Sequence, residues 1–409
     1  MEKEKKGISL INQIMIGVVL GVISGVLFPQ ISQQISIIGD IFLRLMQMAI
    51  PLLVLGQIVQ ALGGIDRKEL STIGIRTILI FAISSILASY WGILAGLIFK
   101  PGSGIDMSLV SEEAVQAQEL SIAETLVAFF PSNIMQSLSQ GTIIQIIIFA
   151  LFFGLALNKF MASKPDSKLT QLIEDFNDVI MNVIRLVMNF APIGIFSLMA
   201  STIGETGLGV IMPLLSYLLI FAAAMLVFMG LWIMVVSLYC RISPMDIIRG
   251  IKNMSIVAVS TVSSAITLPV AMEDTKGKLG VSNRIADLVL PLGVSLNSNG
   301  AAMHMAITVI TVAQMYGIEM TLQTIIYLGV LATFVSLANA VVPGASLVSL
   351  AIIFPQVGLP LESIALFAGL DYFVGMIRTI LNVDSDVFTA MLVAKSVGEF
   401  NFDKNQVSE

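Results

Sequence analysis

The chain has 409 residues, of which 56% are hydrophobic and only 12% are charged. Soluble domains carry about twice that share of charge, so the composition excludes an ordinary water-soluble protein and favours one embedded in lipid. The net charge of −6 argues against binding to nucleic acid, and the single cysteine, Cys240, excludes an internal disulfide.

A membrane-spanning helix needs about 20 consecutive, mostly apolar residues. Eight stretches meet this requirement: residues 8–29, 40–63, 73–99, 121–158, 173–203, 208–239, 283–315 and 361–394. Several are longer than a straight span, which indicates tilt, breaks or extensions. In the fourth stretch, Pro131 and Gly141 predict a break within residues 129–142.

Two further apolar stretches, residues 245–275 and 320–356, carry helix breakers at their centres. The first has serines and threonines followed by Pro269, and the second has Pro343 and Gly344. A small, polar centre between two short apolar arms predicts a re-entrant hairpin, whose tip is buried in protein or faces a watery cavity. Two ordinary kinked helices are the alternative.

Lysine and arginine set the predicted orientation. The basic residues cluster near residues 3–6, 67–76, 159–168, 241–252, 276–284 and 395–404. With eight spans and two hairpins, all these clusters fall on one face. That face is expected to be cytoplasmic, with both termini inside the cell.

A hairpin followed by a polar stretch within a helix occurs twice in the second half of the chain. The first hairpin precedes Asn-Ser-Asn-Gly at residues 297–300, and the second precedes Asn-Val-Asp-Ser-Asp at residues 382–386. The two hairpins enter from opposite sides. This arrangement is typical of a secondary transporter with inverted repeats and a binding site near the membrane midplane.

The last helix contains the most informative polar residues. Arg378, Asn382 and Asp386 are spaced by four and therefore share one face of the helix. A charge at the bilayer centre costs about 2.5–3.5 kcal/mol on insertion scales, so such residues indicate a function. We predict that Arg378 binds a substrate carboxylate, whereas Asp386 and the asparagines bind a cation. A direct Arg378–Asp386 pair is disfavoured, because eight residues of helix rise about 12 Å.

Three weaker signals lie nearby. The turn at residues 297–300 offers amide and backbone oxygens, and Gly300 permits an unwound backbone. Ser263 and Ser264 are able to donate hydrogen bonds to an anion at a helix N-terminus, or simply to pack. His304, the only histidine, is expected to have a packing or interfacial role rather than to relay protons.

Four segments together resemble the dicarboxylate/amino acid:cation symporter family, which includes the glutamate transporters. Residues 263–269 (SSAITLP) are similar to its serine-rich hairpin tip, and residues 342–345 (VPGA) to its second tip. Residues 297–301 (NSNGA) match its Asn-Met-Asp-Gly-Thr turn. Residues 378–386 (RTILNVDSD) resemble its Arg-Thr-Met-Val-Asn-Val-x-Gly-Asp segment.

The resemblance implies an all-α polytopic protein of the cell membrane, with eight transmembrane helices, two re-entrant hairpins and no organic cofactor. It implies a homotrimer in which each protomer works as an elevator. Residues 1–70 and 105–205 would form a static scaffold, and residues 71–104 and 206–409 a mobile transport unit. The first hairpin would be residues 245–275, and the second hairpin, residues 320–356, would be the outer gate.

The resemblance also implies two sets of site residues. The substrate set is Arg378, Thr379, Asn382, Ser263, Ser264, Gly344 and Gly375. The cation set is Asp386, Asn297 and Asn382, which would surround one ion, with Na⁺ as the candidate metal, together with Asn299, Ser84 and Ser85 at a second site.

The departures from the family pattern decide the predicted substrate. Gly375 stands where the amino-acid carriers have an aspartate for the substrate ammonium, and an ammonium buried without a partner is costly. Asn299 stands where the family has a sodium-binding aspartate, and Phe81 replaces an aromatic hydroxyl. We therefore predict a symporter of C4-dicarboxylates (succinate, fumarate or malate) that couples to protons rather than sodium, with Asp386 or Asp384 as proton carrier.

Three alternatives remain from the sequence. A sodium-coupled symporter of acidic or neutral amino acids would bind its ammonium through backbone groups or Asp371. An anion channel would line its pore with the same ionisable cluster. An enzyme is disfavoured, because the sequence shows no nucleophile–base pair and no metal-site spacing.

Overall fold

The computed structural model describes residues 10–63, 73–103, 127, 129–164, 167–337 and 345–403. The described residues confirm the all-α class, and their one β-bridge joins Val281 to Phe400. The helices are α1 (Leu10–Leu27), α2 (Pro29–Gln34), α3 (Ser36–Gly63), α5 (Ile75–Phe99), α7 (Ile134–Gln140), α8 (Ile143–Ser163), α9 (Leu169–Met188), α10 (Ala191–Thr206), α11 (Ile211–Cys240), α12 (Pro244–Thr261), α13 (Ser264–Gly277), α14 (Asn283–Leu296), α15 (Asn299–Met315), α16 (Leu322–Leu337), α17 (Ala345–Gln356), α18 (Ile364–Ala368) and α19 (Asp371–Val397).

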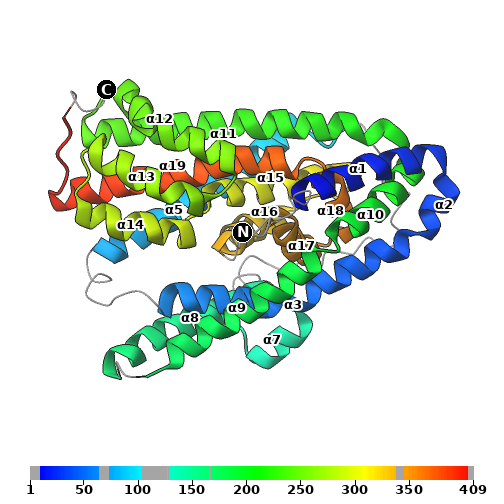
Figure 1. The fold of residues 1–409 in the computed structure, drawn as a ribbon, viewed down its shortest axis with the longest axis horizontal. Coiled ribbons are helices and arrows are strands. Elements are labelled where there is room, and N and C mark those ends of the chain that lie inside the picture. Colours follow the sequence, from blue (N-terminus) through cyan, green and yellow to red (C-terminus); the bar gives the residue numbers. More distant parts are fainter. Residues whose placement is uncertain are drawn as a thin grey trace, which may run out of the picture.

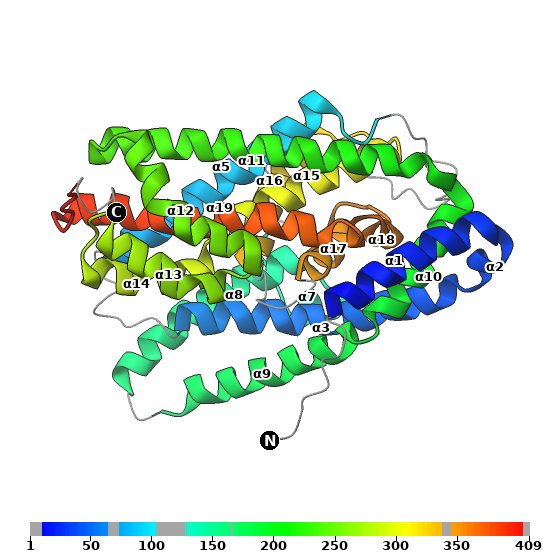
Figure 2. The same ribbon diagram turned by 45° about the horizontal axis from the view of Figure 1, so that its top comes forward.

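The helices pack in two groups. In the first group, α3 lies against α8, α9 and α10, and α10 also packs along α1. In the second group, α19 lies at the centre and contacts α11, α12, α14 and α15, while α5 packs against α15. Figures 1 and 2 show α3, α8 and α9 along one side of the molecule and α11 along the other. Contacts of α17 with α3 and of α18 with α10 join the groups.

Large apolar side chains are exposed on the outside of the bundle. On α11, Leu219, Leu226 and Leu238 are 63%, 65% and 74% exposed. An exposed apolar surface of this extent is unfavourable in water and normal for a helix that faces lipid tails. The structure therefore agrees with a multi-pass membrane protein.

The described part of the structure has fewer helices that are long and apolar enough to span a membrane than the eight that the sequence predicts. Among the described residues, four qualify, within Pro29–Gln60, Ile75–Phe99, Ile143–Ser163 and Gly207–Cys240. Two bent pairs raise the number to six if each is one span. The predicted span 283–315 is divided into α14 and α15, and the start of the predicted span 121–158 lies outside the described residues. The count of eight stays a prediction.

The polar stretch at residues 382–386 does not interrupt the last helix. Helix α19 runs without a break through this polar stretch, and the chain instead bends by 85° between α18 and α19. Neighbouring groups satisfy the polar side chains: Asn382 accepts a hydrogen bond from the Gly300 backbone, and Asp384 accepts one from Ser255. The helix therefore has no need to unwind there.

The break predicted within residues 129–142 is present. Helix α7 ends at Gly141, which has a φ of +66°, a left-handed conformation that glycine adopts without steric cost. Helix α8 starts two residues later and extends to Ser163, beyond the predicted end at residue 158.

The residues of the first predicted hairpin form two helices in mutual contact. Helix α12 ends at Thr261, Val262 adopts a left-handed φ of +52°, and Ser263 caps α13 by accepting a hydrogen bond from the Ile266 N–H. The Asp274 carboxylate of α13 accepts a hydrogen bond from the Met254 N–H of α12 at 3.1 Å. Helices α16 and α17 also contact each other, but the predicted second tip, with Gly344, lies outside the described residues.

Three glycines hold α1 against α10. Gly17, Gly21 and Gly25 follow one another at intervals of four and meet the backbone oxygens of Pro192, Phe196 and Ala200. Such a stripe of small residues lets two helix backbones approach closely, which is the main source of helix association in lipid.

The change Gly21→Ala should destabilise the protein. The new Cβ would lie 2.8 Å from the Phe196 carbonyl oxygen and 2.9 Å from the Met199 Cβ, closer than packed atoms allow. We expect overpacking to cost about 1–3 kcal/mol, measured as a lower Tm of the purified protein in detergent.

Gly230→Ala is the matched control, because a Cβ at this position of α11 meets nothing within 4 Å. Alanine favours a helix over glycine by about 1 kcal/mol, so its Tm should stay equal or rise. Equal shifts for the two variants would contradict the role of the glycine stripe.

Candidate functional site

The candidate site forms where the break between α14 and α15 meets α19. Helix α14 ends at Leu296, Asn297 is extended (φ −124°, ψ 106°), and α15 begins at Asn299. Both helices contact α19. The predicted turn at residues 297–300 is thus a true interruption of the helix, and its polar groups face the polar stretch of α19.

Two hydrogen bonds join the turn to α19. The Asn297 amide donates to the Asp386 carboxylate at 2.7 Å, and the Gly300 N–H donates to the Asn382 side-chain oxygen at 2.8 Å. Asp386 is 3% exposed, and no basic side chain among the described residues lies within 4 Å of it. The carboxylate is therefore buried against neutral partners.

Glycine is required at two points of this contact. A Cβ at Gly293 would collide with the Asp386 carboxylate, and a Cβ at Gly300 would collide with the Arg378 carbonyl. These two positions allow α14 and α15 to approach α19 closely enough for the hydrogen bonds of Asn297 and Gly300.

A second polar cluster joins the same turn to α5. Ser84 and Ser85 donate hydrogen bonds to the Asn299 side-chain oxygen at 3.2 and 2.7 Å, and Ser85 also lies 3.5 Å from the Asn297 side-chain oxygen. The Asn299 amide nitrogen is buried without a partner. Carboxylate, amide and hydroxyl oxygens are the ligands that hard cations prefer, so the two clusters have the chemistry of a cation pathway.

The described residues contain no group of three or more His, Cys, Asp or Glu side chains placed to hold a metal ion. A cation at this site would be held mainly by neutral oxygens, with Asp386 as the charged ligand. Phe81, which is buried on α5 one turn before the serines, contributes no oxygen from its side chain.

Arg378 presents unpaired donors. Its Nε and Nη1 are buried without a hydrogen-bond partner, and no carboxylate in the described part of the chain lies within 4 Å of the guanidinium. Asp371, two turns earlier on α19, and Tyr217 on α11 are its electrostatic neighbours. A planar guanidinium with free N–H groups is suited to a carboxylate ligand.

Three of the remaining predicted substrate residues, Gly375, Ser263 and Ser264, lie at the turn between α12 and α13 or contact it, whereas Gly344 lies outside the described residues. Gly375 is buried on α19, and a Cβ there would lie 2.6 Å from the Val262 side chain at that turn. Thr379 donates a hydrogen bond to the Gly375 carbonyl at 2.7 Å. Ser263 and Ser264 follow Val262 directly, so the structure brings their segment next to α19.

Three more polar side chains lie near Arg378 or Asp386: Asp384, predicted as an alternative proton carrier; Asp371, predicted as an alternative partner for a substrate ammonium; and Tyr217, for which the sequence predicted no role. Asp384 accepts hydrogen bonds from the Ser255 hydroxyl of α12 at 3.0 and 3.2 Å. Tyr217 shares a hydrogen bond of 2.9 Å with Thr308. Asp371 has one carboxylate oxygen without a partner. Only Tyr217 was missed, because no local sequence pattern places α11 against α19.

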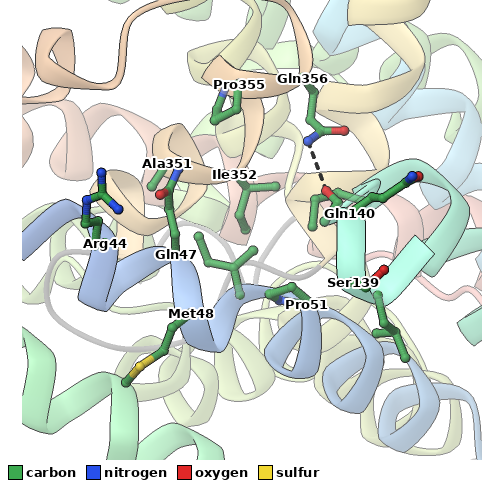
Figure 3. A pocket seen from close by; sticks show the side chains of 14 residues that line it. Arg44, Gln47, Met48, Pro51, Ser139, Gln140, Ala351, Ile352, Pro355 and Gln356 are labelled. Atoms are coloured by element: carbon green, nitrogen blue, oxygen red, sulfur yellow. Dashed lines mark hydrogen bonds between the residues drawn. The ribbon is translucent and has the colours of Figure 1, made fainter. Parts of the chain in front are cut away.

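A separate cavity of about 560 Å³ lies between α3, α7 and α17. Figure 3 shows Arg44 and Gln47 of α3 facing Ala351 and Ile352 of α17 across it. The Gln356 amide of α17 donates a hydrogen bond to the Gly141 carbonyl at 3.1 Å. None of the predicted substrate or cation residues lines this cavity, which lies where the two helical groups meet.

Comparison with known proteins identifies the family. The family model of the sodium:dicarboxylate symporter family matches residues 10–396. The chain therefore belongs to the sodium:dicarboxylate symporter family. It is a cation-coupled membrane transporter and not an enzyme.

The relatives are named for different substrates. The chain is 33% identical to the proton/sodium-glutamate symport protein of Bacillus caldotenax, over 98% of this chain and 97% of that protein. It is 32% identical to the proton/glutamate-aspartate symporter of Escherichia coli, over 97% and 94% of the two chains. The C4-dicarboxylate transport protein of Laribacter hongkongensis is 28% identical, over 99% and 93%.

The change Asn299→Asp should strengthen sodium binding. A carboxylate would replace a neutral oxygen between Ser84 and Ser85, and ligand charge contributes much of the affinity for a hard cation. The sodium concentration that gives half-maximal uptake should fall by about tenfold, which corresponds to about 1.4 kcal/mol.

Uptake into proteoliposomes at a series of sodium concentrations measures this effect. Asn401→Asp adds the same charge at an exposed position after α19 and should leave the sodium dependence unchanged. An unchanged sodium requirement in Asn299→Asp would show that the Asn299 cluster binds no sodium.

Proposed function

We propose that this protein imports C4-dicarboxylates, such as succinate, fumarate and malate, across the cell membrane together with a cation. One observation carries the proposal: Arg378 has unpaired donors, whereas Gly375, one turn earlier, presents no carboxylate to an ammonium. The site thus has a partner for a carboxylate at one end of the substrate and lacks the usual partner for an amino group.

The arrangement around Arg378 supports a second carboxylate contact. Thr379 and Asn382 lie on the same helix as Arg378, and the N-terminus of α13 begins at Ser264, next to the turn that touches Gly375. Backbone N–H groups at a helix N-terminus favour an anion. We propose that Arg378 binds one carboxylate of the dicarboxylate, and that Thr379, Asn382, Ser263 and Ser264 bind the other. Gly344 of the second hairpin completes the proposed site.

An acidic amino acid is the second candidate. Asp371 has a carboxylate oxygen without a partner and is an electrostatic neighbour of Arg378. An ammonium at this carboxylate would replace the contact that Gly375 cannot provide. The relatives that are named as glutamate or glutamate-aspartate symporters also favour an acidic amino acid.

We infer proton coupling in preference to sodium coupling, because Asn299 and Phe81 leave the second cation cluster without a formal charge or an aromatic hydroxyl. We also infer an elevator mechanism, in which the group around α19 moves against the group around α3. The two packed groups support this inference. In this proposal α12–α13 and α16–α17 are re-entrant hairpins, the protein is a homotrimer, and both termini are cytoplasmic.

Succinate, fumarate and malate should inhibit uptake of labelled succinate far better than aspartate or glutamate do. The physical reason is the desolvation of an ammonium that finds no carboxylate at Gly375. Competition in proteoliposomes measures the order of inhibition. Equal or stronger inhibition by aspartate would favour the amino-acid candidate.

The change Gly375→Asp sharpens this test. It adds a negative charge beside the bound dicarboxylate as well as a Cβ that meets Val262. Gly375→Ala adds the Cβ alone and is the matched control. We expect Gly375→Asp to weaken succinate binding more than Gly375→Ala does, through like-charge repulsion.

Arg378→Ala should abolish succinate uptake, because truncating one partner of a buried, hydrogen-bonded charge pair costs about 2–5 kcal/mol, or at least about thirtyfold in affinity. Arg378→Lys should recover little, since an ammonium does not reproduce the planar fork. Binding of succinate to purified, folded protein measures both variants. The exposed Arg185→Ala should bind as the unmodified protein does, and full recovery by lysine would show that only the positive charge matters.

A further inference from the structure

His304 is buried at the centre of the second helical group. It is the only histidine of the chain and is 1% exposed. Its Nδ1 is buried without a hydrogen-bond partner. The rings of Phe221 and Tyr217 on α11 lie 5.8 and 6.4 Å from the imidazole. A packing role alone leaves this polar nitrogen unsatisfied, which is costly in an apolar interior.

His304 lies one helical turn beyond the point where α15 meets Arg378. His304 lies four residues after Gly300, and a Cβ at Gly300 would collide with the Arg378 backbone, so both residues are on the face of α15 that meets α19. His304 and Arg378 interact electrostatically. His304 therefore packs in the core, as the sequence predicts, and also lies within the electrostatic influence of Arg378, the proposed substrate-binding residue.

The titratable groups around His304 are few. Helix α19 contributes Arg378 and Asp371, and α11 contributes Tyr217, whose hydroxyl is engaged with Thr308. On α5, Tyr90 packs against Gly329 and Arg76 bonds to Ser396; on α16, Tyr327 packs against Phe129. Helix α17 has no titratable side chain. Arg378 is therefore the dominant charge beside the imidazole.

The charge on Arg378 controls what His304 is able to bind. Near a buried guanidinium that has no carboxylate within 4 Å among the described residues, a second positive charge is strongly disfavoured. A substrate carboxylate on Arg378 offsets that charge and adds negative charge within reach of the imidazole. Protonation of His304 and binding of a dicarboxylate then favour each other, and this coupling is reciprocal.

We propose that His304 binds the coupling proton of this transporter: its Nδ1 takes one proton from outside water as the dicarboxylate binds Arg378 and releases it inside with the substrate. No bond other than N–H forms or breaks. This inference rests on the proposed contact between Arg378 and a substrate carboxylate. It assigns the coupling proton to His304 on α15, whereas the sequence suggested Asp386 or Asp384 on α19.

The single histidine makes the test direct. The protein is labelled with ¹⁵N-histidine, purified with an affinity tag that contains no histidine, and placed in liposomes for solid-state NMR. At pH 7, saturating succinate should convert the imidazole from mostly neutral to mostly protonated. A neutral imidazole in both states would overturn the proposal.

A second measurement counts protons. Calorimetry of succinate binding in buffers of different ionisation enthalpy should give close to one proton taken up per succinate. The apparent Kd for succinate should increase by up to about tenfold for each unit by which the pH is raised. His304→Gln should still bind succinate, with no proton uptake and no pH dependence. Proton uptake that persists in His304→Gln and disappears in Asp386→Asn would assign the proton to Asp386 instead.

The same experiments separate this inference from the proposed substrate. If glutamate binds and succinate does not, the proposed substrate is wrong, and the NMR and calorimetry are repeated with glutamate. Because either ligand places a carboxylate on Arg378, protonation of His304 with glutamate would sustain the proton site. A neutral imidazole with bound glutamate would overturn it.

Discussion

A carboxylate buried among apolar helices has to find its hydrogen bonds within the protein, and Asp386 sets this requirement for the second helical group. Its hydrogen bond comes from the Asn297 amide, which reaches it because the helix between α14 and α15 is interrupted there. The interruption in turn directs Asn299 toward Ser84 and Ser85 on α5. One buried charge thus ties α14, α15, α5 and α19 into a single unit.

The sequence predicted part of this unit directly. The shared face of Arg378, Asn382 and Asp386 follows from helix periodicity and from the cost of charge in lipid. The Asn-Gly step gave only a weak signal for the turn at residues 297–300, and Ser84 and Ser85 were assigned through the resemblance to the symporter family. The uninterrupted course of α19 was not predictable, because it depends on Ser255 of α12 and the backbone of Gly300, both distant in sequence. The position of His304 beside Arg378 likewise depends on how α15 crosses α19, which no local pattern records.

The turn between α12 and α13 packs closely against α19, because the Val262 side chain lies where a Cβ at Gly375 would need space. Val262 is β-branched and has a positive φ of 52°, a strained conformation that persists only where the surroundings enforce it. Its side chain fills the space that a Cβ at residue 375 would need. An aspartate at residue 375 would therefore have to displace the turn between α12 and α13, so the residue at this position affects both the charge of the proposed substrate site and the packing of the turn.

Charge balance connects these features to symport. Helix α19 carries two buried carboxylates, Asp384 and Asp386, and both have only neutral partners among the described residues. Arg378 offsets one negative charge at most, and Asp371 already lies near it. A dianionic substrate would add two more negative charges to a region where uncompensated charge is costly. A cation or proton that enters with such a substrate would offset part of this added charge, which links the electrostatics of the site to symport.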